Sequence, residues 1–114
     1  MSIIFHIANR KAWEIGREAG SYRPELFASE GFIHCSTAEQ VIPVANNRFR
    51  GQSGLILLAI DTDRVTHPIR YENLEGGEEL FPHIYGELHP GAVVRVSDFN
   101  LGLDGYFTMP EVSD

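Results

Sequence analysis

Three histidines on apolar segments are the residues of this chain best suited to chemistry. His6, His34 and His83 are each flanked by hydrophobic residues, which predicts that each lies on a largely buried strand. Burying a polar group without a hydrogen bond costs a few kcal/mol, so each imidazole needs a partner. That partner is either a backbone carbonyl of the core or a ligand. We expect that not all three serve packing alone.

The stretch Glu30–Gln40 combines one of these histidines with a strand end and a helix start. His34 and Ser36 lie two residues apart, so they should share one face of a strand. Ser36 and Glu39 have capping-box spacing, which predicts a helix beginning at about Thr37. A polar pair beside the free N–H groups of a helix N-terminus can hold an anionic or polyhydroxyl ligand. This stretch is therefore the candidate ligand site.

Two kinds of ligand could use the three imidazoles. His6, His34 and His83, with Cys35 or Glu87 nearby, could bind a zinc ion that keeps one position open. The sequence lacks the short ligand spacings H-x-H and H-E-x-x-H, so we predict no metal site. A neutral imidazole donates at one nitrogen and accepts at the other, which suits sugar hydroxyls. We therefore favour a ligand that carries a sugar.

Aromatic and acidic side chains near these strands extend the candidate site. Tyr71 and Tyr85 could stack on a flat ring or could simply pack. Glu72 and Glu87 are the nearest carboxylates, and either could act as a base, stabilise a cation or remain a solvated acid. Cys35 points away from its strand neighbours, so we expect a buried apolar residue rather than a nucleophile.

Composition limits the partners and the location. The chain of 114 residues has 9 Lys and Arg against 16 Asp and Glu, a net charge of −7, which disfavours nucleic acid as a partner. Its length predicts a single domain over residues 1–114. The single Cys35 excludes an internal disulfide, and with no secretory signal this predicts a cytoplasmic location. No apolar run reaches the roughly 18 residues of a membrane span, so we predict no membrane partner.

The elements predicted from the pattern are about six short strands and two helices. Strands are expected over Ser2–Ala8, Phe32–His34, Leu55–Ile60, Ile69–Glu72, Phe81–Gly86 and Ala92–Val96. Helices are expected over Arg10–Ala19, weakened by Gly16, and Thr37–Phe49, kinked or shortened by Pro43. Tyr22–Glu30 should be a loop, and the tail from Asp98 should be irregular, with Leu101, Leu103, Tyr106 and Phe107 as anchors. The fold class is α+β, a split or bent, mostly antiparallel sheet with both helices in the N-terminal half.

Three segments together resemble a known family. The strand of His6, the run Gly31–Ser36 and the run Phe81–Gly86 resemble domain of unknown function 952, a small bacterial family, and the resemblance covers nearly the whole chain. That family is similar in fold to the ADP-ribosyltransferases, and most similar to their RNA 2′-phosphotransferase branch. The resemblance implies an ADP-ribosylation-like fold with NAD, a small-molecule nucleotide, held in the cleft of a split sheet.

The resemblance also assigns roles by position. His6 resembles the first-strand histidine that contacts the nicotinamide ribose, and His34 and Ser36 resemble the second-strand histidine and the serine after it. Ile84–Tyr85 stands at the third position, where many transferases carry a catalytic glutamate. The absence of a glutamate there argues against ordinary protein ADP-ribosylation. His6-Ile7-Ala8 stands where the phosphotransferases have His-Gly-Thr, and their phosphate-binding arginines have no clear match here.

Two functions follow from these observations, and both stay open. In the first, the chain is an NAD-dependent ADP-ribosyl- or phosphotransferase, or a glycohydrolase, with His6 and His34 as catalytic residues. The residues that would bind NAD are His6, His34, Ser36, His83 and Tyr85, with Tyr85 stacked on nicotinamide. In the second, the chain is a non-catalytic module that binds a small ligand or a protein with the same cleft.

Overall fold

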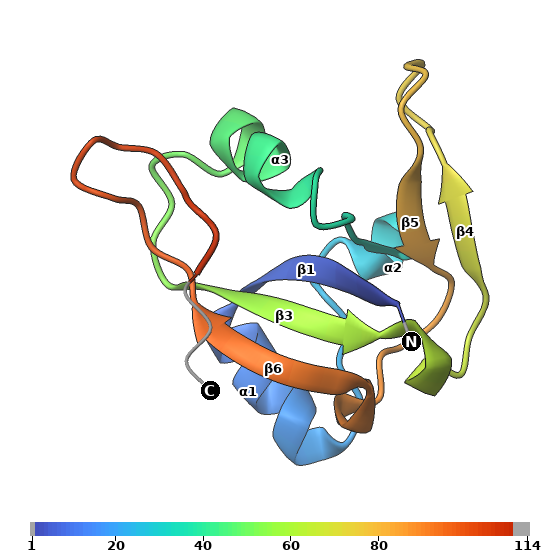
Figure 1. The fold of residues 1–114 in the computed structure, drawn as a ribbon. Helices are drawn as coiled ribbons and strands as arrows, with labels where there is room; N and C mark the ends of the chain where they lie inside the picture. The colour runs from blue at the N-terminus through green and yellow to red at the C-terminus, as the bar shows by residue number, and fades with distance from the viewer. Residues whose placement is uncertain (1, 111–114) are drawn as a thin grey trace.

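The computed structural model describes residues 2–110, whose strands form two antiparallel sheets of three strands each (Figure 1). The first sheet has the order β1-β3-β6, with β1 (Ile3–Asn9), β3 (Leu55–Asp61) and β6 (Val93–Asp98). The second has the order β2-β5-β4, with β2 (Ile33–His34), β5 (Phe81–Ile84) and β4 (Ile69–Glu72). Two short 3₁₀ turns, η1 (Thr62–Arg64) and η2 (Pro90–Ala92), complete the connections. The predicted α+β class with six strands is confirmed.

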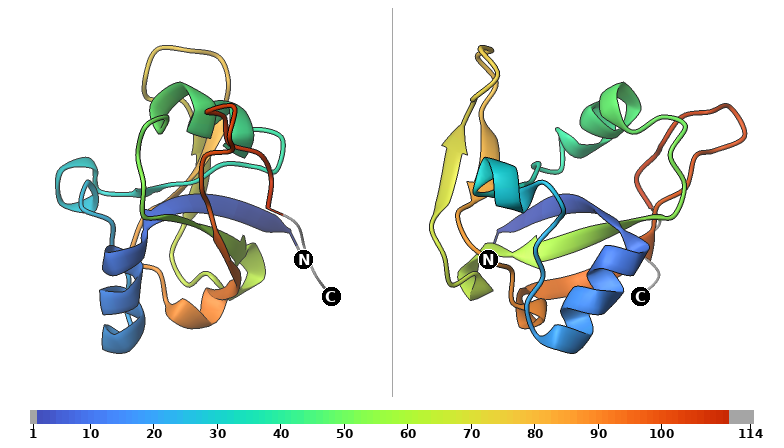
Figure 2. Two further views of the ribbon diagram at one scale, coloured as in Figure 1. Left: turned by 90° about the vertical axis from the view of Figure 1, so that its left-hand side faces the viewer. Right: turned by 180° about the vertical axis from the view of Figure 1, so that it is seen from behind.

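The first sheet is covered on both faces, which explains why its central strand is apolar up to its last residue, Asp61. All seven residues of β3 are buried, as expected for a strand with packed layers on either side. Helix α1 (Arg10–Ala19) packs through Trp13 on one face, and α3 (Val41–Arg48) packs on the other (Figures 1 and 2).

Helix α1 has the bounds that its sequence predicts. The Asn9 side chain caps its start by accepting the Ala12 N–H at 3.2 Å. Gly20 ends it at φ 82°, a left-handed conformation that glycine adopts without steric cost.

The prediction of only two helices is wrong, because the expected loop Tyr22–Glu30 contains a helical turn. Helix α2 (Phe27–Glu30) is a single turn that ends at Gly31, whose φ is 81°. Four residues are too few to show a helical hydrophobic period, so the pattern gave no signal for this element.

Helix α3 begins later than the capping-box spacing predicts. Its first residue is Val41, and Ser36 instead pairs through its backbone with Phe5. The Gln40 side chain accepts the Thr37 N–H at 3.0 Å, so it makes the reach-back bond that Glu39 was expected to make. Pro43 is the third residue of the shortened helix, where its missing N–H removes no helical hydrogen bond.

The two sheets meet along β1. The backbones of Phe5 and Ser36 exchange two hydrogen bonds, Phe5 N–H to the Ser36 carbonyl at 2.7 Å and Ser36 N–H to the Phe5 carbonyl at 2.8 Å. The segment after β2 thus lies against the edge of β1 that β3 leaves unpaired. Side chains of both sheets, among them Ile4 and Ile84, share one hydrophobic cluster. The arrangement is the split sheet that the sequence predicts.

Pro82 is the second residue of β5, near the start of the central strand of its sheet, and its carbonyl accepts the Cys35 N–H at 2.9 Å. In the tail, Phe107 is buried beside Phe99, whereas Leu103 is fully exposed and Tyr106 is half exposed, so those two are not anchors. Between residues 2 and 110, no helix is long and apolar enough to cross a bilayer.

Candidate functional site

A cavity of about 630 Å³ lies between the two sheets and below α3. Its lining residues come from β1, β2, α3, the β4–β5 hairpin and the segment 24–30 that contains α2, and Figure 1 shows how these elements are arranged. Four of the five predicted ligand-binding residues line it: His6, His34, Ser36 and His83. The fifth, Tyr85, is not among the lining residues. The volume is in the usual range of about 300–1,000 Å³ for small-molecule pockets.

His6 is held by two hydrogen bonds that fix its tautomer. Its Nδ1 lies 2.7 Å from the His34 carbonyl, so Nδ1 carries the proton and donates. Burial lowers the pKa of the imidazole to about 4, although the bond to the carbonyl opposes this shift. The neutral Nε2 is therefore an acceptor, and the Tyr22 hydroxyl donates to it at 2.8 Å. Both ring nitrogens of His6 are satisfied within the fold.

His34, His83 and Glu72 form a chain of hydrogen bonds along the cavity wall. His34 Nδ1 lies 3.1 Å from His83 Nε2, and His83 Nδ1 donates to Glu72 Oε1 at 3.0 Å. The Tyr85 hydroxyl donates to the same oxygen. These bonds, first that from Tyr85 and then that from His83, lower the pKa of the Glu72 carboxyl. This series of hydrogen bonds therefore ends at the Glu72 carboxylate, which stays ionised at neutral pH.

At the other end of this series of hydrogen bonds, one nitrogen of His34 has no partner. In the part of the chain that the structure describes, His34 Nε2 is buried and has no hydrogen-bond partner. Burial, followed by the nearby His83, lowers the pKa of the His34 imidazole to about 4. Because His83 Nδ1 donates to Glu72, His83 Nε2 can accept from His34 Nδ1, and this arrangement leaves a lone pair on His34 Nε2. A buried nitrogen of this kind gains a partner when a ligand supplies one.

Ser36 completes the polar side of the cavity. It is buried, its backbone is fixed by hydrogen bonds to Phe5, and it belongs to the cavity lining.

The antiparallel register explains why the imidazoles of His34 and His83 meet. His34 of β2 stands opposite His83 of β5, and residues opposite each other in a ladder have neighbouring side chains.

Tyr85 supports the cavity wall from outside the lining. Its hydroxyl bonds Glu72, its ring is tilted against Phe32 at 5.5 Å, and the Arg70 guanidinium lies 5.3 Å from its centre. Phe32 in turn stacks on His83 at 4.1 Å and lines the cavity. The phenylalanines that line the cavity are Phe32, Phe49 and Phe81.

The other sequence candidates lie elsewhere. Glu87 accepts a hydrogen bond from Ser21 and does not line the cavity, so of the two predicted carboxylates only Glu72 lies at the site. Burial raises the pKa of the Cys35 thiol, which is unsuited to act as a nucleophile. Tyr71 is half exposed and is also absent from the lining. Within residues 2–110, no three His, Cys, Asp or Glu side chains are placed to hold a metal ion.

Sequence reasoning missed the contribution of α3 and of the aromatic side chains. Arg48 and Phe49 line the cavity, as do Phe32 and Phe81. Phe81 is tilted against His34 at 5.2 Å. The alternation of β4 and β5 could have revealed Phe81, because Glu72 stands directly opposite it in the ladder. No sequence signal places α3 above the histidines.

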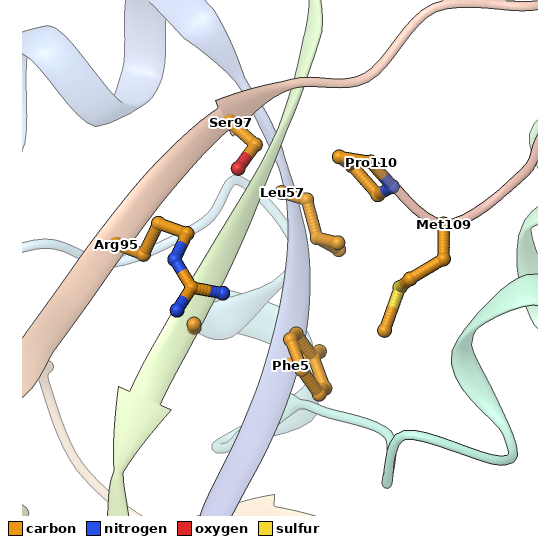
Figure 3. Close-up of a pocket in the computed structure, with 7 residues that line it drawn as sticks. Phe5, Leu57, Arg95, Ser97, Met109 and Pro110 are labelled. Carbon is orange, nitrogen blue, oxygen red and sulfur yellow. The ribbon is translucent and has the colours of Figure 1, made fainter. Parts of the chain in front are cut away.

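A second pocket, of about 40 Å³, opens on the face of the first sheet that α3 covers (Figure 3). It is lined by Phe5, Leu57, Ala59, Arg95, Ser97, Met109 and Pro110. None of the predicted site residues reaches it, and its volume is too small for a nucleotide.

The comparisons with known proteins establish the family. A family model described as "Protein of unknown function (DUF952)" matches residues 7–96. The chain belongs to this family. It is also similar to the crystal structure of protein CC0527 from Caulobacter crescentus, with 32% identity, a TM-score of 0.83 and 94% of each chain covered.

The solution structure of CC0527 agrees, with 34% identity, a TM-score of 0.80, and coverage of 93% of this chain and 91% of that chain. No curated protein matches the chain. The DUF952 family and its fold are thereby shown.

Proposed function

We propose that this DUF952 domain binds a nicotinamide-ribosyl nucleotide of the NAD type in the cavity between its sheets. The observation that carries the proposal is that His34, whose buried Nε2 has no hydrogen-bond partner, lines a cavity together with His6, Ser36 and His83. A ribose hydroxyl both donates and accepts, so it pairs with this nitrogen in either tautomer. The choice of NAD rests on the resemblance to the ADP-ribosyltransferase fold, which is an analogy.

The cavity offers a place for each part of such a ligand. His34 and Ser36 bind the hydroxyls of the nicotinamide ribose. Phe32 and Phe81 contact the flat nicotinamide ring, a role first expected for Tyr85. His6 holds the His34 backbone in place and so positions the site, because its own ring nitrogens are occupied by the fold.

In the enzymatic form of this proposal, the bond between C1′ and the nicotinamide nitrogen breaks. Its electron pair leaves with nicotinamide, and positive charge develops on the ribose. A hydroxyl of water or of an acceptor then adds to C1′, and its proton passes to His34 Nε2. The carboxylate of Glu72, linked through His83, stabilises the imidazolium that forms.

A non-catalytic module is the second candidate, and one observation favours it. Glu72 Oε1 accepts hydrogen bonds from both His83 and Tyr85, so the fold holds this carboxylate instead of presenting it to a ligand. The module would bind NAD without cleaving it.

Calorimetric titration with NAD tests the proposal. We expect saturable binding below millimolar NAD and roughly tenfold weaker binding by His34→Asn, which keeps an amide near the Nδ1 position and removes Nε2. His89→Asn is the matched control, since His89 lies outside the lining and asparagine can keep its cap on η2. No binding at millimolar NAD, or equal binding by wild type and His34→Asn, would contradict the proposal.

Nicotinamide release separates the two candidates. Over hours with saturating NAD, the enzyme produces free nicotinamide and its His34→Asn variant produces less. A module that binds NAD leaves it intact under the same conditions.

A further inference from the structure

The charged side chains of the cavity are mostly acidic. Its lining contains four carboxylates and one guanidinium: Glu25, Glu30, Glu72, Glu75 and Arg48. Arg48 forms an ion pair with Glu75, so the single positive charge at the wall is already matched by a negative one. An excess of negative charge remains, and a second negative group placed beside it would be repelled.

The helix above the cavity adds to this negative character. The last residue of α3, Arg48, and the C-cap Phe49 both line the cavity, as does Val44 from the middle of the helix, so the C-terminal end of α3 lies at the cavity wall. The last carbonyls of a helix have no intrahelical partner, and the helix dipole places partial negative charge there. A helix C-terminus attracts cations, whereas nucleotide phosphates are typically bound at helix N-termini.

Aromatic rings supply the matching apolar contacts. Phe32, Phe49 and Phe81 all line the cavity. A cation positioned over an aromatic face is attracted by the ring quadrupole, and this attraction strengthens when water is excluded. Rings combined with carboxylates form a site for a flat organic cation.

We infer that this site recognises the cationic nicotinamide-ribosyl part of a nucleotide and makes no favourable contact with phosphates. The inference rests on the proposed function and narrows its ligand class. The positively charged ring lies among the phenylalanines and carboxylates, and its ribose hydroxyls pair with His34 Nε2 and Ser36. A pyrophosphate at the same wall would face carboxylates and a guanidinium that is already paired.

Three ligands titrated at one ionic strength test the inference. Nicotinamide riboside has the cation without phosphate, NAD has both, and ADP-ribose has phosphates without the cation. We expect nicotinamide riboside to bind at least as tightly as NAD and at least about tenfold more tightly than ADP-ribose.

The outcomes separate this inference from the proposed function. Tighter binding of NAD than of nicotinamide riboside, or equal binding of ADP-ribose and nicotinamide riboside, overturns the inference and leaves a nucleotide site. No binding of any of the three overturns the proposed function as well.

A variant of the Arg48 ion pair gives an independent measurement. Glu75→Gln releases the guanidinium for phosphate, so we expect the affinity for NAD relative to nicotinamide riboside to rise several-fold. Glu78→Gln removes the same charge from the same loop at an exposed position outside the lining, and we expect no change in that ratio. An unchanged ratio in Glu75→Gln, or an equal rise in both variants, contradicts the inference.

Discussion

At the residue scale, His6 makes the stability of the folded state depend on pH. Its imidazole is buried and neutral, and both of its nitrogens are occupied, by the His34 carbonyl and the Tyr22 hydroxyl. Protonation would place a second hydrogen on Nε2, which now accepts a hydrogen bond, and would charge a buried ring. The folded state therefore binds this proton more weakly than the unfolded chain.

This difference predicts acid sensitivity. Since burial lowers the pKa of His6 from 6.5 to about 4, the unfolded state holds more protons between these values, and stability falls as pH decreases through this window. His6 contributes about 3 kcal/mol that is present above pH 6.5 and lost by about pH 4. Urea denaturation at a series of pH values measures this loss.

His6→Asn is the test variant, because asparagine can still donate to the His34 carbonyl but does not titrate. Its free energy of unfolding should fall less steeply between pH 6.5 and pH 4 than that of the wild type. Parallel pH profiles for the two proteins would show that His6 does not cause the effect.

The sequence predicted which residues need partners but not which partners they find. Apolar flanks predicted that His6, His34 and His83 lie on largely buried strands, and the structure buries His6 and His83 and partly buries His34. The partner of His6 Nε2 is Tyr22, 16 positions along the chain, in a segment that the pattern placed in a loop. The contact of His34 with His83 depends on the pairing register of β2 and β5, which is a property of the assembled sheet.

At the element scale, Gly16 allows α1 to pack closely against Tyr22, in the segment that follows the helix. A Cβ at position 16 would lie 2.8 Å from both Cα and Cβ of Tyr22, closer than real Cβ contacts allow. The neighbouring atom is backbone, so it cannot yield by a change of rotamer. Gly16 therefore serves close packing, although the helix itself would be more stable with alanine.

We predict that Gly16→Ala destabilises the protein. The overlap costs typically about 1–3 kcal/mol, and the gain in helix propensity returns up to about 1 kcal/mol. Chemical denaturation should show a lower free energy of unfolding than wild type. Glu14→Ala, at an exposed position of α1, should stay within about 0.5 kcal/mol. A neutral or stabilising Gly16→Ala would mean that α1 can move away from Tyr22.

Long and strongly patterned elements were predictable from sequence, and short ones were not. The bounds of α1 and the burial of β3 followed from periodicity and apolar content. The start of α3 depends on which of two capping bonds forms. Glu39 could accept from the Ser36 N–H, or Gln40, one position later, could accept from the Thr37 N–H. The structure uses Gln40 because Ser36 is engaged by Phe5, a contact between segments about 30 residues apart in the chain.

At the scale of the whole molecule, the two sheets share one core. Ile33 and Ile84 of the second sheet belong to the same hydrophobic cluster as Ile4 and Leu58 of the first. The direct backbone link between the sheets is the pair of hydrogen bonds of Phe5 with Ser36. The cavity lies where the sheets diverge, so the apolar cluster has to hold its walls in place.

This shared core predicts that both sheets unfold together. The fluorescence of Trp13, which is buried against Tyr22, reports on the first sheet and α1, and the NMR methyl signals of Ile33 and Ile84 report on the second sheet. In urea the two signals should change at one midpoint, as a two-state transition requires.

Ile84→Ala should shift the midpoints of both unfolding curves equally to lower urea concentration, since truncating a fully buried isoleucine costs about 2–5 kcal/mol. Loss of the methyl signals before the tryptophan signal, or a shift of only one curve in Ile84→Ala, would show instead that the β4–β5 hairpin opens as a separate unit. The cavity walls would then be able to move apart without unfolding the first sheet.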